Sequence, residues 1–253
     1  MKTVIVTGAS SGIGREFAEV LGNLSHVEEI WVIARRGGRL EELKNTIAAT
    51  VLPLELDLTR NEALDAYRKL LADRNPQVVA LVNAAGYGCM GEVENVELSD
   101  QRGMIDLNIT ALTAITKLTL PYMSYGAEIY QLGSFSAFTP LPYMSVYAAT
   151  KAYVLSFSRS LNVELKARGI HSMAVCPSWV RTEFPDRAAT YRDVIVFFDH
   201  FYTPEQVIQR ALRDMKKRKD VSVCGGKHRL LRLSLKLLPQ RFAMKLWCIQ
   251  QKK

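Results

Sequence analysis

Two side chains that could share a proton stand four residues apart in the stretch SVYAATKAYVLSF, residues 145–157. They are Tyr147 and Lys151, and on a helix residues four apart project from one face. A free tyrosine has a pKa near 10, so at pH 7 only about one in a thousand is ionised, a handicap of ~4 kcal/mol for a base. A lysine charge ~5 Å away would recover ~3 kcal/mol at an effective dielectric of ~20. The alternative is an ordinary solvated helix, and the pair alone does not decide between the two.

The composition bounds the class of protein. The chain has 253 residues, of which 48% are hydrophobic and 23% charged, values typical of a globular protein with a large core, and α/β folds reach this length as one domain. The first residues, MKTVIVTGAS, run into a strand pattern rather than a signal peptide. No uncharged apolar stretch approaches the ~18 to 20 residues that span a bilayer. The four cysteines have no paired or metal-like spacing, so we expect reduced core thiols, no metal site and a cytoplasmic protein.

Short apolar runs alternate with helical patterns along the chain, which predicts an α/β fold with a doubly wound parallel sheet of Rossmann type. We expect one domain over residues 1–226, including a lid over 178–202, and an amphipathic extension over 227–253 packed on the same domain. The predicted strands are 2–8, 29–35, 51–57, 78–86, 127–134, 170–178 and 220–226, and the predicted helices are 14–24, 39–48, 61–73, 99–124 and one that holds Tyr147 and Lys151.

A glycine-rich turn, TGASSGIG, runs from Thr7 to Gly14 between the first predicted strand and the first predicted helix. In a doubly wound fold this turn faces the ligand crevice. Gly8, Gly12 and Gly14 let the backbone approach a pyrophosphate, which the free N–H groups and positive dipole end of the helix would hold. The alternative is a glycine-rich turn without a ligand, and the position after the first strand favours the phosphate loop. The spacing differs from the more widespread G-x-G-x-x-G pattern.

Several motifs in the same order make the chain resemble the short-chain dehydrogenase/reductases, in their form of about 250 residues. TGASSGIG looks like the cofactor loop of that family, and NAAG, residues 83–86, looks like the motif that closes its fourth strand. Asn108, in IDLNITA, sits where the family keeps a catalytic-site asparagine on a long helix. Ser134 precedes Tyr147 by thirteen residues, the usual separation in the family, and the opening stretch matches its Y-x-x-x-K motif.

The resemblance implies a catalytic role for each of four residues. Tyr147 would be the proton donor in reduction and the base in oxidation, and Lys151 would lower its pKa and bind the nicotinamide ribose. Ser134 would hold the carbonyl oxygen beside Tyr147 and give the oxyanion a second donor. Asn108 would help to hold a water that relays the proton to bulk. Ser136, which lies close to Ser134 in the sequence, is expected to be structural.

The end of the second predicted strand, VIARRGGR, indicates the phosphate state of the cofactor. NAD-preferring proteins usually place an acid here to bond the ribose 2′-hydroxyl, whereas this chain has Arg35 and Arg36 and no acid before Glu41. A guanidinium fork suits a 2′-phosphate, so we expect NADP(H), with NAD(H) less favoured and a solvated arginine pair as the alternative. The resemblance implies that Asp57 binds adenine and that Leu58 follows it. The expected cofactor contacts are Gly8, Ser10, Ser11, Gly12, Ile13, Gly14, Arg35, Arg36, Asp57, Leu58, Asn83, Ala84, Gly86, Tyr147, Lys151, Pro177 and Thr182.

The turn after the sixth predicted strand departs from the family pattern. The family commonly has Pro-Gly here, followed a few residues later by a threonine on the carboxamide, and this chain reads CPSWVRTEF. Pro177 is present, Ser178 replaces the glycine, and Thr182 stands where the carboxamide contact is expected. The turn is therefore expected to differ slightly from that of the family, which bears on Thr182 more than on Tyr147.

These residues favour an NADP(H)-dependent oxidoreductase that interconverts a secondary alcohol and its ketone on a hydrophobic substrate. Aromatic residues in the predicted lid suit a steroid-like or acyl-like molecule, or else packing against the domain itself. The alternative is a non-catalytic cofactor-binding or membrane-surface protein of the same fold, and the complete set of four catalytic residues argues against it. The lid aromatic residues are Trp179, Phe184, Tyr191, Phe197, Phe198, Phe201 and Tyr202.

The net charge of +8 is concentrated in the C-terminal extension. Residues 227–253 hold eight Lys and Arg and no Asp or Glu, and the other 25 basic residues equal the 25 acidic ones in number. A polyanion binder would carry its basic patch in the fold itself, so we expect no nucleic acid as a partner. In the family that the chain resembles, the two longest helices commonly pair between subunits. The resemblance therefore implies a homodimer or homotetramer.

The stretch KHRLLRLSLKLLPQRFAMKLW predicts a basic amphipathic helix that Pro239 breaks. Such a helix can lie on an anionic membrane. Alternatively its leucines cover the substrate pocket or a subunit interface, which the resemblance favours, or its charges receive acidic substrates such as carrier-bound acyl groups. One face holds Arg229, Arg232 and Lys236, and another holds Leu230, Leu233 and Leu237, widened by Leu231, Leu235 and Leu238 and followed after the break by Phe242, Leu246 and Ile249.

Overall fold

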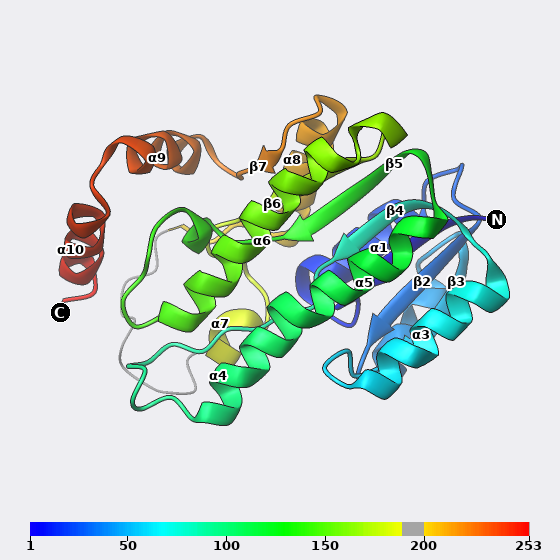
Figure 1. Ribbon diagram of the computed structural model, residues 1–253, viewed down its shortest axis with the longest axis horizontal. Helices are drawn as coiled ribbons and strands as arrows, with labels where there is room; N and C mark the ends of the chain where they lie inside the picture. Colours follow the sequence, from blue (N-terminus) through cyan, green and yellow to red (C-terminus); the bar gives the residue numbers. More distant parts are fainter. Residues whose placement is uncertain (189–199, 253) are drawn as a thin grey trace.

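Seven strands pair in parallel and form one sheet. They are β1 (Lys2–Thr7), β2 (Glu29–Ala34), β3 (Thr50–Glu55), β4 (Gln77–Asn83), β5 (Met123–Leu132), β6 (His171–Val175) and β7 (Val221–Ser222). The structure is a computed structural model, and it describes residues 1–188 and 200–252. The order of the strands in the sheet is β3-β2-β1-β4-β5-β6-β7 (Figure 1). The order reverses between β1 and β4, and ligands of such sheets bind outside the carboxyl ends of the strands at this switch point.

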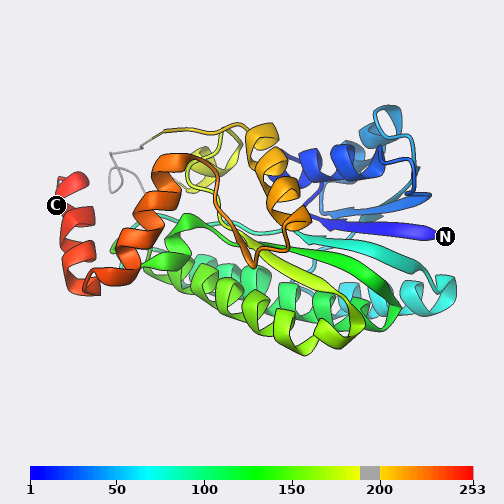
Figure 2. The same ribbon diagram turned by 90° about the horizontal axis from the view of Figure 1, so that it is seen from above.

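Helices cover both faces of the sheet, which confirms the predicted doubly wound α/β fold. On one face lie α1 (Gly12–Gly22) and α8 (Pro204–Lys216), and on the other lie α3 (Asn61–Arg74), α5 (Leu112–Thr119) and α6 (Ser145–Glu164) (Figure 2). The remaining helical segments are α2 (Gly37–Glu41), α4 (Leu98–Ile105), α7 (Phe184–Ala188), α9 (Gly226–Leu237), α10 (Gln240–Gln250), a π-helical segment (Asp106–Ala111) and 3₁₀ turns at Glu42–Asn45, Leu120–Tyr122, Phe135–Phe138 and Lys166–Arg168.

Alternate residues of the central strands enter two separate cores. In β1, Val4 and Val6 pack with α1 and α8, whereas Ile5 between them packs with α3 and α5. All three side chains are buried. Because both faces of the strand are covered, its sequence is a continuous apolar run rather than an alternating one.

The prediction of one continuous helix over residues 39–48 is wrong. The structure has the short helix α2 there, followed by a 3₁₀ turn over Glu42–Asn45. Leu40 and Leu43 are both buried, and a 3₁₀ turn brings residues three apart onto one side. The burial of this pair therefore explains the tighter turn.

The helix predicted over residues 99–124 is shorter at its end than expected. The helical run begins at Leu98 and finishes in the 3₁₀ turn that holds Pro121, and β5 starts at Met123. Proline has no backbone N–H to continue a helix. The chain consequently enters the sheet four residues before the predicted strand start at Ala127.

The C-terminal extension forms α9 and α10, and the break predicted at Pro239 is confirmed because α9 ends at Leu237 and α10 begins at Gln240. Figures 1 and 2 both show these helices at one end of the molecule, with the N-terminus at the other. Of the predicted lid aromatic residues, Tyr191, Phe197 and Phe198 lie outside the described residues. Within the described chain, no helix is both long and apolar enough to cross a bilayer.

A buried carboxylate, Asp214 of α8, joins the last part of the chain to the sheet. It accepts hydrogen bonds from Arg210 Nε at 2.7 Å and from Ser222 Oγ of β7 at 3.0 Å, and Lys219 Nζ lies 2.9 Å from it. Burial raises the pKa of this carboxyl, but the hydrogen bonds from Lys219, Arg210 and Ser222 outweigh burial and the pKa lies below its usual range. The ionised form is therefore the stable one in the fold.

We expect Asp214→Asn to lower the free energy of unfolding by about 2 to 4 kcal/mol at pH 7, because two cations would lose a buried partner. A depressed folded pKa contributes stability that is present above the unfolded value near 3.8 and is lost as pH falls through the folded value. The difference between variant and wild type should therefore shrink below pH 4 in urea titrations followed by circular dichroism. Asp65→Asn, which removes an exposed pair with Arg68, is the matched control and should cost less than about 1 kcal/mol. A deficit for Asp214→Asn that does not change with pH would contradict this account.

Candidate active site

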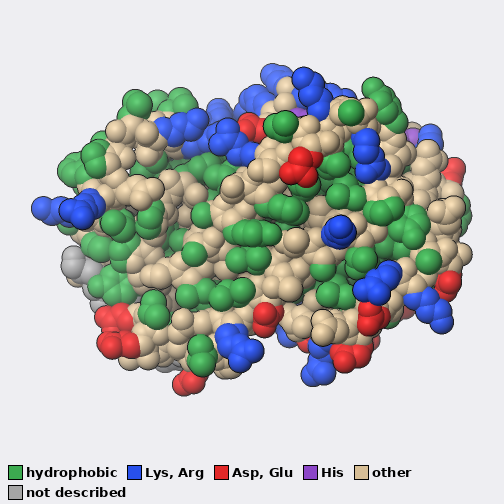
Figure 3. Space-filling model, in the orientation of Figure 1, with side chains coloured by type: hydrophobic (Ala, Val, Ile, Leu, Met, Phe, Trp, Pro, Cys, Tyr) green, Lys and Arg blue, Asp and Glu red, His purple; other side chains and the backbone are tan. Residues whose placement is uncertain are grey.

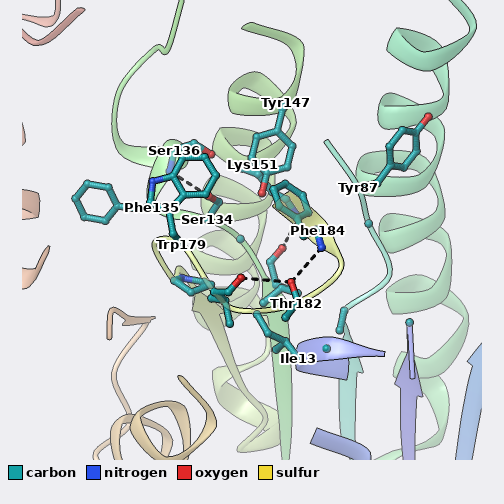
Figure 4. A pocket seen from close by; sticks show the side chains of 18 of the residues that line it. Ile13, Tyr87, Ser134, Phe135, Ser136, Tyr147, Lys151, Trp179, Thr182 and Phe184 are labelled. Carbon is teal, nitrogen blue, oxygen red and sulfur yellow. Dashed lines mark hydrogen bonds between the residues drawn. The ribbon is translucent and has the colours of Figure 1, made fainter. Parts of the chain in front are cut away.

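One cavity of about 960 Å³ lies at the carboxyl ends of the central strands and brings most of the predicted site residues together. Its wall runs from the glycine loop at one end to the C-terminal helices at the other (Figure 4 shows the central part). Two predicted site residues, Asn83 and Asn108, do not line it. The predicted residues that do are Gly8, Ser10, Ser11, Gly12, Ile13, Gly14, Arg35, Arg36, Asp57, Leu58, Ala84, Gly86, Ser134, Tyr147, Lys151, Pro177 and Thr182.

The glycine loop has backbone angles that favour glycine. Gly8 has a φ of 71° and Gly12 a φ of 55°, and a Cβ on Gly8 would lie 2.7 Å from the backbone nitrogen of Ala85. Helix α1 begins at Gly12, and the side chain of its N-cap, Ser11, makes no capping hydrogen bond. The first N–H groups of the helix therefore remain to bind an anion, and the dipole favours one there. A loop without side chains at the start of a helix fits the pyrophosphate of a dinucleotide.

Tyr147, Ser134 and Lys151 meet at the middle of the cavity (Figure 4). Tyr147 and Lys151 come from the first two turns of α6, with side chains on one face as their spacing predicts. The ammonium of Lys151 lies 5.7 Å from the centroid of the Tyr147 ring and donates a hydrogen bond of 2.8 Å to the carbonyl oxygen of Leu132. Ser134, just beyond β5, lies close enough to Tyr147 for its hydroxyl to lower the pKa of the phenol, and its Oγ accepts a hydrogen bond of 3.2 Å from the Ser136 N–H. The hydroxyl of Ser134 and the phenol of Tyr147 thus lie side by side on the cavity wall.

Burial sets the protonation of this pair. It raises the pKa of Tyr147 to about 12, against a smaller lowering by the hydrogen bond with Ser134, and it lowers the pKa of Lys151 to about 8. The sequence led us to expect a low pKa for the tyrosine, but in the protein alone the removal of both groups from water outweighs their attraction. Tyr147 is consequently a protonated phenol at neutral pH, the form that donates a proton.

Asn108 holds the neighbourhood of the pair in place from the π-helical segment Asp106–Ala111. Its amide nitrogen donates to the carbonyl oxygen of Tyr87 at 2.9 Å and to Thr150 Oγ1 at 3.0 Å, and its oxygen accepts from the Tyr87 N–H at 3.0 Å. A π turn inserts one residue into an α-helix and is frequent at functional sites. The asparagine therefore links the long helix to α6 and to the loop after β4.

Asn83, expected as a cofactor contact, is a buried link between elements. Its amide nitrogen donates to Thr116 Oγ1 at 2.9 Å and to Gln131 Oε1 at 3.0 Å. These bonds join β4 to α5 and β5, behind the cavity wall that Ala84 and Gly86 form. The sequence showed the NAAG motif, but it did not show that the side chain of Asn83, the first residue of the motif, points away from the cavity.

Arg36 crosses the glycine loop at the end of the cavity where the sequence predicts the adenine to bind, which we call the adenine end. It donates to Ser10 Oγ at 3.0 Å, to Ser11 Oγ at 2.7 Å and to Glu183 at 2.8 Å. Arg39 binds the other oxygen of Glu183, and the hydrogen bonds from Arg39 and Arg36 lower the pKa of this carboxyl to about 2. Sequence reasoning missed Arg39 and Glu183, since nothing local in the sequence pairs residues 147 positions apart.

Arg35, the other arginine predicted to bind the 2′-phosphate, lies close to Asp57. Burial raises the pKa of Asp57, but hydrogen bonds from Thr59 and the charge of Arg35 hold it below its usual range. Asp57 therefore keeps a negative charge at the adenine end, where Thr59 fixes its orientation through a 2.7 Å hydrogen bond.

The opposite end of the cavity is lined mostly by apolar residues, with Lys227, His228 and Gln250 among its polar ones. Phe184 packs on the ring of Tyr147 with centroids 5.4 Å apart, and Trp179 lies nearby (Figure 4). Ser136, expected to be structural, also lines the cavity, and its buried Oγ has no hydrogen-bond partner among the described residues. Sequence reasoning assigned the lid aromatics but missed the contributions of the loop after the 3₁₀ turn at Phe135–Phe138. The apolar lining comprises Leu141, Met144, Trp179, Phe184, Leu231, Leu235, Leu238, Ala243, Leu246 and Trp247.

Comparison with known proteins places the chain in the short-chain dehydrogenase/reductase family. Residues 2–192 match the family model described as short chain dehydrogenase, which covers most of the chain. The chain therefore belongs to this family and is an oxidoreductase of Rossmann-type fold.

Three relatives illustrate the likeness. Sulfoacetaldehyde reductase 2 of Chromohalobacter salexigens is 33% identical over 205 residues, which cover 75% of this chain and 81% of that protein. A short-chain dehydrogenase from Sphingobium yanoikuyae, solved in complex with NADPH, is 32% identical with a TM-score of 0.78 and covers 88% of this chain and 87% of its own. The bulky-bulky ketone specific alcohol dehydrogenase from Comamonas testosteroni is 26% identical with a TM-score of 0.73, over 88% of this chain and 86% of its own.

We expect Lys151→Met to be more stable than the wild type by about 2 kcal/mol at pH 7. Burial of the ammonium, whose pKa is about 8 against an ordinary 10.5, destabilises the wild type by up to about 3 kcal/mol. The variant lacks the hydrogen bond to Leu132, which reduces its advantage by about 1 kcal/mol. Because the unfolded state binds more protons between pH 8 and 10.5, the wild type gains stability as pH rises through this window. The advantage of the variant should therefore disappear near pH 10.5 in urea titrations.

The control for this prediction is Lys166→Met, which replaces an exposed lysine near the end of α6. Its difference from the wild type should be small and independent of pH. A Lys151→Met protein that is less stable than the wild type at pH 7 would show that burial of this ammonium is not a cost.

Proposed function

We propose that the protein is an NADP(H)-dependent reductase that converts a bulky hydrophobic ketone to a secondary alcohol. The observation that carries this proposal is the position of Ser134, Tyr147 and Lys151 between two unlike ends of one cavity. One end has a glycine loop, free helix N–H groups and arginines, and the other is mostly apolar. A dinucleotide and a hydrophobic carbonyl compound would thus meet at the phenol.

The chemistry of the chain's own residues follows from their protonation. When bound, the reduced nicotinamide supplies a hydride to the carbonyl carbon of the substrate. Tyr147, whose pKa of about 12 keeps it protonated, donates its proton to the carbonyl oxygen, so that the ketone becomes a secondary alcohol and the phenol becomes a phenolate. Ser134 donates a second hydrogen bond to the same oxygen as negative charge develops there. Lys151 then stabilises the phenolate until it is reprotonated.

The arginines at the adenine end support NADP(H) over NAD(H). Arg36 faces the cavity between Ser10 and Ser11, and no acid stands at the end of β2 to accept a ribose 2′-hydroxyl. The Sphingobium relative was solved with NADPH. A 2′-phosphate would compete with Glu183 for the guanidinium groups of Arg36 and Arg39.

The apolar end of the cavity supports a bulky substrate. Its wall is aromatic and aliphatic, and C-terminal leucines extend it beyond Trp179 and Phe184. The Comamonas relative is described as specific for bulky-bulky ketones. The test is a screen of NADPH consumption with steroids and 3-oxoacyl thioesters first, then with small aldehydes such as sulfoacetaldehyde. Turnover confined to the small aldehydes would overturn the substrate class and leave the reaction type in place.

The expected homodimer or homotetramer and the cytoplasmic location stay predictions. So does the alternative of a non-catalytic cofactor-binding protein, which would bind NADPH without consuming it in any such screen. The convergence of three catalytic side chains on the cavity argues against that alternative.

Tyr147→Phe should lose about 10²- to 10⁴-fold in turnover, because the variant has no proton to donate. NADPH affinity, measured by fluorescence titration, should change little, since the glycine loop and arginines are untouched. Tyr153→Phe is the matched control, as Tyr153 lies on the same helix but bonds Thr113 outside the cavity, and it should keep its activity. Substantial residual turnover in Tyr147→Phe would remove this phenol from the mechanism.

The double variant Arg35→Ala with Arg36→Ala should narrow the preference for NADPH over NADH by roughly ten- to hundredfold. A hydrogen bond to a charged group contributes about 1.5 to 3 kcal/mol, and the 2′-phosphate distinguishes the two cofactors. Equilibrium titration of both cofactors measures the ratio directly.

Arg68→Ala, which removes an exposed arginine of α3 paired with Asp65, controls for a general loss of positive charge and should leave the ratio unchanged. If the wild type itself binds NADH more tightly than NADPH, the assignment of the arginines is wrong.

A further inference from the structure

Among the residues that the structure describes, the contacts of α9 and α10 with the domain come from one face of each helix. On α9, Leu231 and Leu235 line the cavity, as does Leu238 just after the helix. The guanidinium of Arg232 lies 5.1 Å from the ring centroid of Phe138. On α10, Trp247 donates a hydrogen bond of 3.0 Å from Nε1 to the carbonyl oxygen of Pro142. These contacts hold both helices in a defined orientation, so their other faces point away from the domain.

The outer faces carry two stripes of exposed apolar side chains. On α9 the stripe is Leu230, Leu233 and Leu237, with exposed fractions of 68%, 56% and 88%. Residues three, four and seven apart lie on one side of a helix. On α10 the same spacing recurs in Phe242, Leu246 and Ile249, of which 49%, 42% and 59% are exposed. The sequence had placed the leucines of residues 230–238 in one broad face, whereas packing divides them into a set that lines the cavity and a set that points away from the domain.

Basic side chains flank both stripes. Arg229 and Lys236 on α9, and Arg241 and Lys245 on α10, are all exposed, and residues 227–253 contain no Asp or Glu. Figure 3 shows hydrophobic and basic side chains together over these helices. We define this surface, formed by the two apolar stripes and the four flanking cations, as the C-terminal face.

We propose that the C-terminal face binds the surface of an anionic lipid membrane. A helix with an apolar stripe, cationic flanks and no acidic residue lies in the interface with its leucines among the acyl chains and its cations at the headgroups. Each Lys or Arg near an anionic leaflet adds to the attraction. A second copy of the chain fits poorly, because a two-fold contact would bring like charges together. A nucleic acid would bind the cations and leave six apolar side chains in water.

The C-terminal face continues into the cavity. Leu231 and Leu246 line the cavity and are also 40% and 42% exposed, so an apolar path leads from the outer face toward Tyr147. A lipophilic ketone dissolved in the membrane could enter the cavity along this path without crossing water. This last step rests on the proposed function, whereas the binding of lipid does not.

Cosedimentation of the full-length protein with vesicles tests the proposal. The wild type should sediment with vesicles of phosphatidylcholine and phosphatidylglycerol at low ionic strength, and much less with pure phosphatidylcholine. Binding should weaken at ~1 M salt, where the Debye length is about 3 Å. The assay needs no substrate or turnover, so vesicle binding supports the proposal even for a preparation that reduces no ketone.

Two double variants separate the apolar and the charged contributions. Leu233→Ser with Leu237→Ser should weaken the partition coefficient at least about tenfold, and Arg229→Gln with Lys236→Gln should weaken it about thirtyfold at low salt. None of these four residues lines the cavity. The matched controls are Val163→Ser, at an exposed site on α6, and Lys216→Gln with Lys217→Gln, at exposed sites at the end of α8. Both controls should sediment as the wild type does.

Three results would overturn the proposal. The first is a wild type that does not sediment with the anionic vesicles at low salt. The second is an oligomer that Leu233→Ser with Leu237→Ser converts to a monomer in sedimentation velocity, which would assign the face to a second copy. The third is binding to soluble polyglutamate that is as tight as binding to vesicles and unchanged by the serine pair, which would assign the face to an acidic protein.

Discussion

The burial of one ammonium group, that of Lys151, is the constraint on which the active site depends. Its removal from water disfavours the charge, and a hydrogen bond to the Leu132 carbonyl offsets part of that cost. The absence of a side chain at Gly86 leaves room chiefly for Asn108 beside it, because a Cβ there would lie 2.8 Å from Asn108 Oδ1 and 3.4 Å from Lys151 Nζ. Tyr147 is buried beside Lys151, and its own removal from water raises the pKa of the phenol to about 12. Burial thus acts on both members of the pair, lowering the pKa of Lys151 and raising that of Tyr147.

The two ends of the cavity differ in their electrostatics, and an ion pair links one of them to the loop after β6. Glu183 bridges Arg36 and Arg39 across the glycine loop, and it follows Thr182, whose methyl group limits the space beside Gly12. An anion that takes the two arginines would release the carboxylate. The ion pair therefore connects the arginines beside the glycine loop to the segment that carries Phe184, the residue that packs on Tyr147.

The C-terminal helices serve two environments at once. Their inner faces complete the apolar wall of the cavity, and their outer faces present leucines and cations outward. Pro239 makes this arrangement possible, because the break lets α10 turn and place Trp247 on the loop at Pro142. The sequence predicted that the extension either covers the pocket or lies at the surface. In the structure one face of each helix lines the cavity and the other faces outward.

The sequence by itself predicted the parallel sheet from its apolar runs, and the structure confirms it. The glycine spacing predicted a phosphate loop, and the resemblance to the family, including the thirteen residues between Ser134 and Tyr147, implied four catalytic residues. The roles of these residues stay predictions. Only the tertiary structure decided that Asn83 faces Thr116 and Gln131 rather than the cavity, that Glu183 binds Arg36, and which leucines of α9 line the cavity. It also decided the pKa of Tyr147, which the sequence led us to expect low. Contacts between distant residues and the extent of burial are properties of the packed chain, and burial outweighed the attraction that the spacing of Tyr147 and Lys151 had indicated.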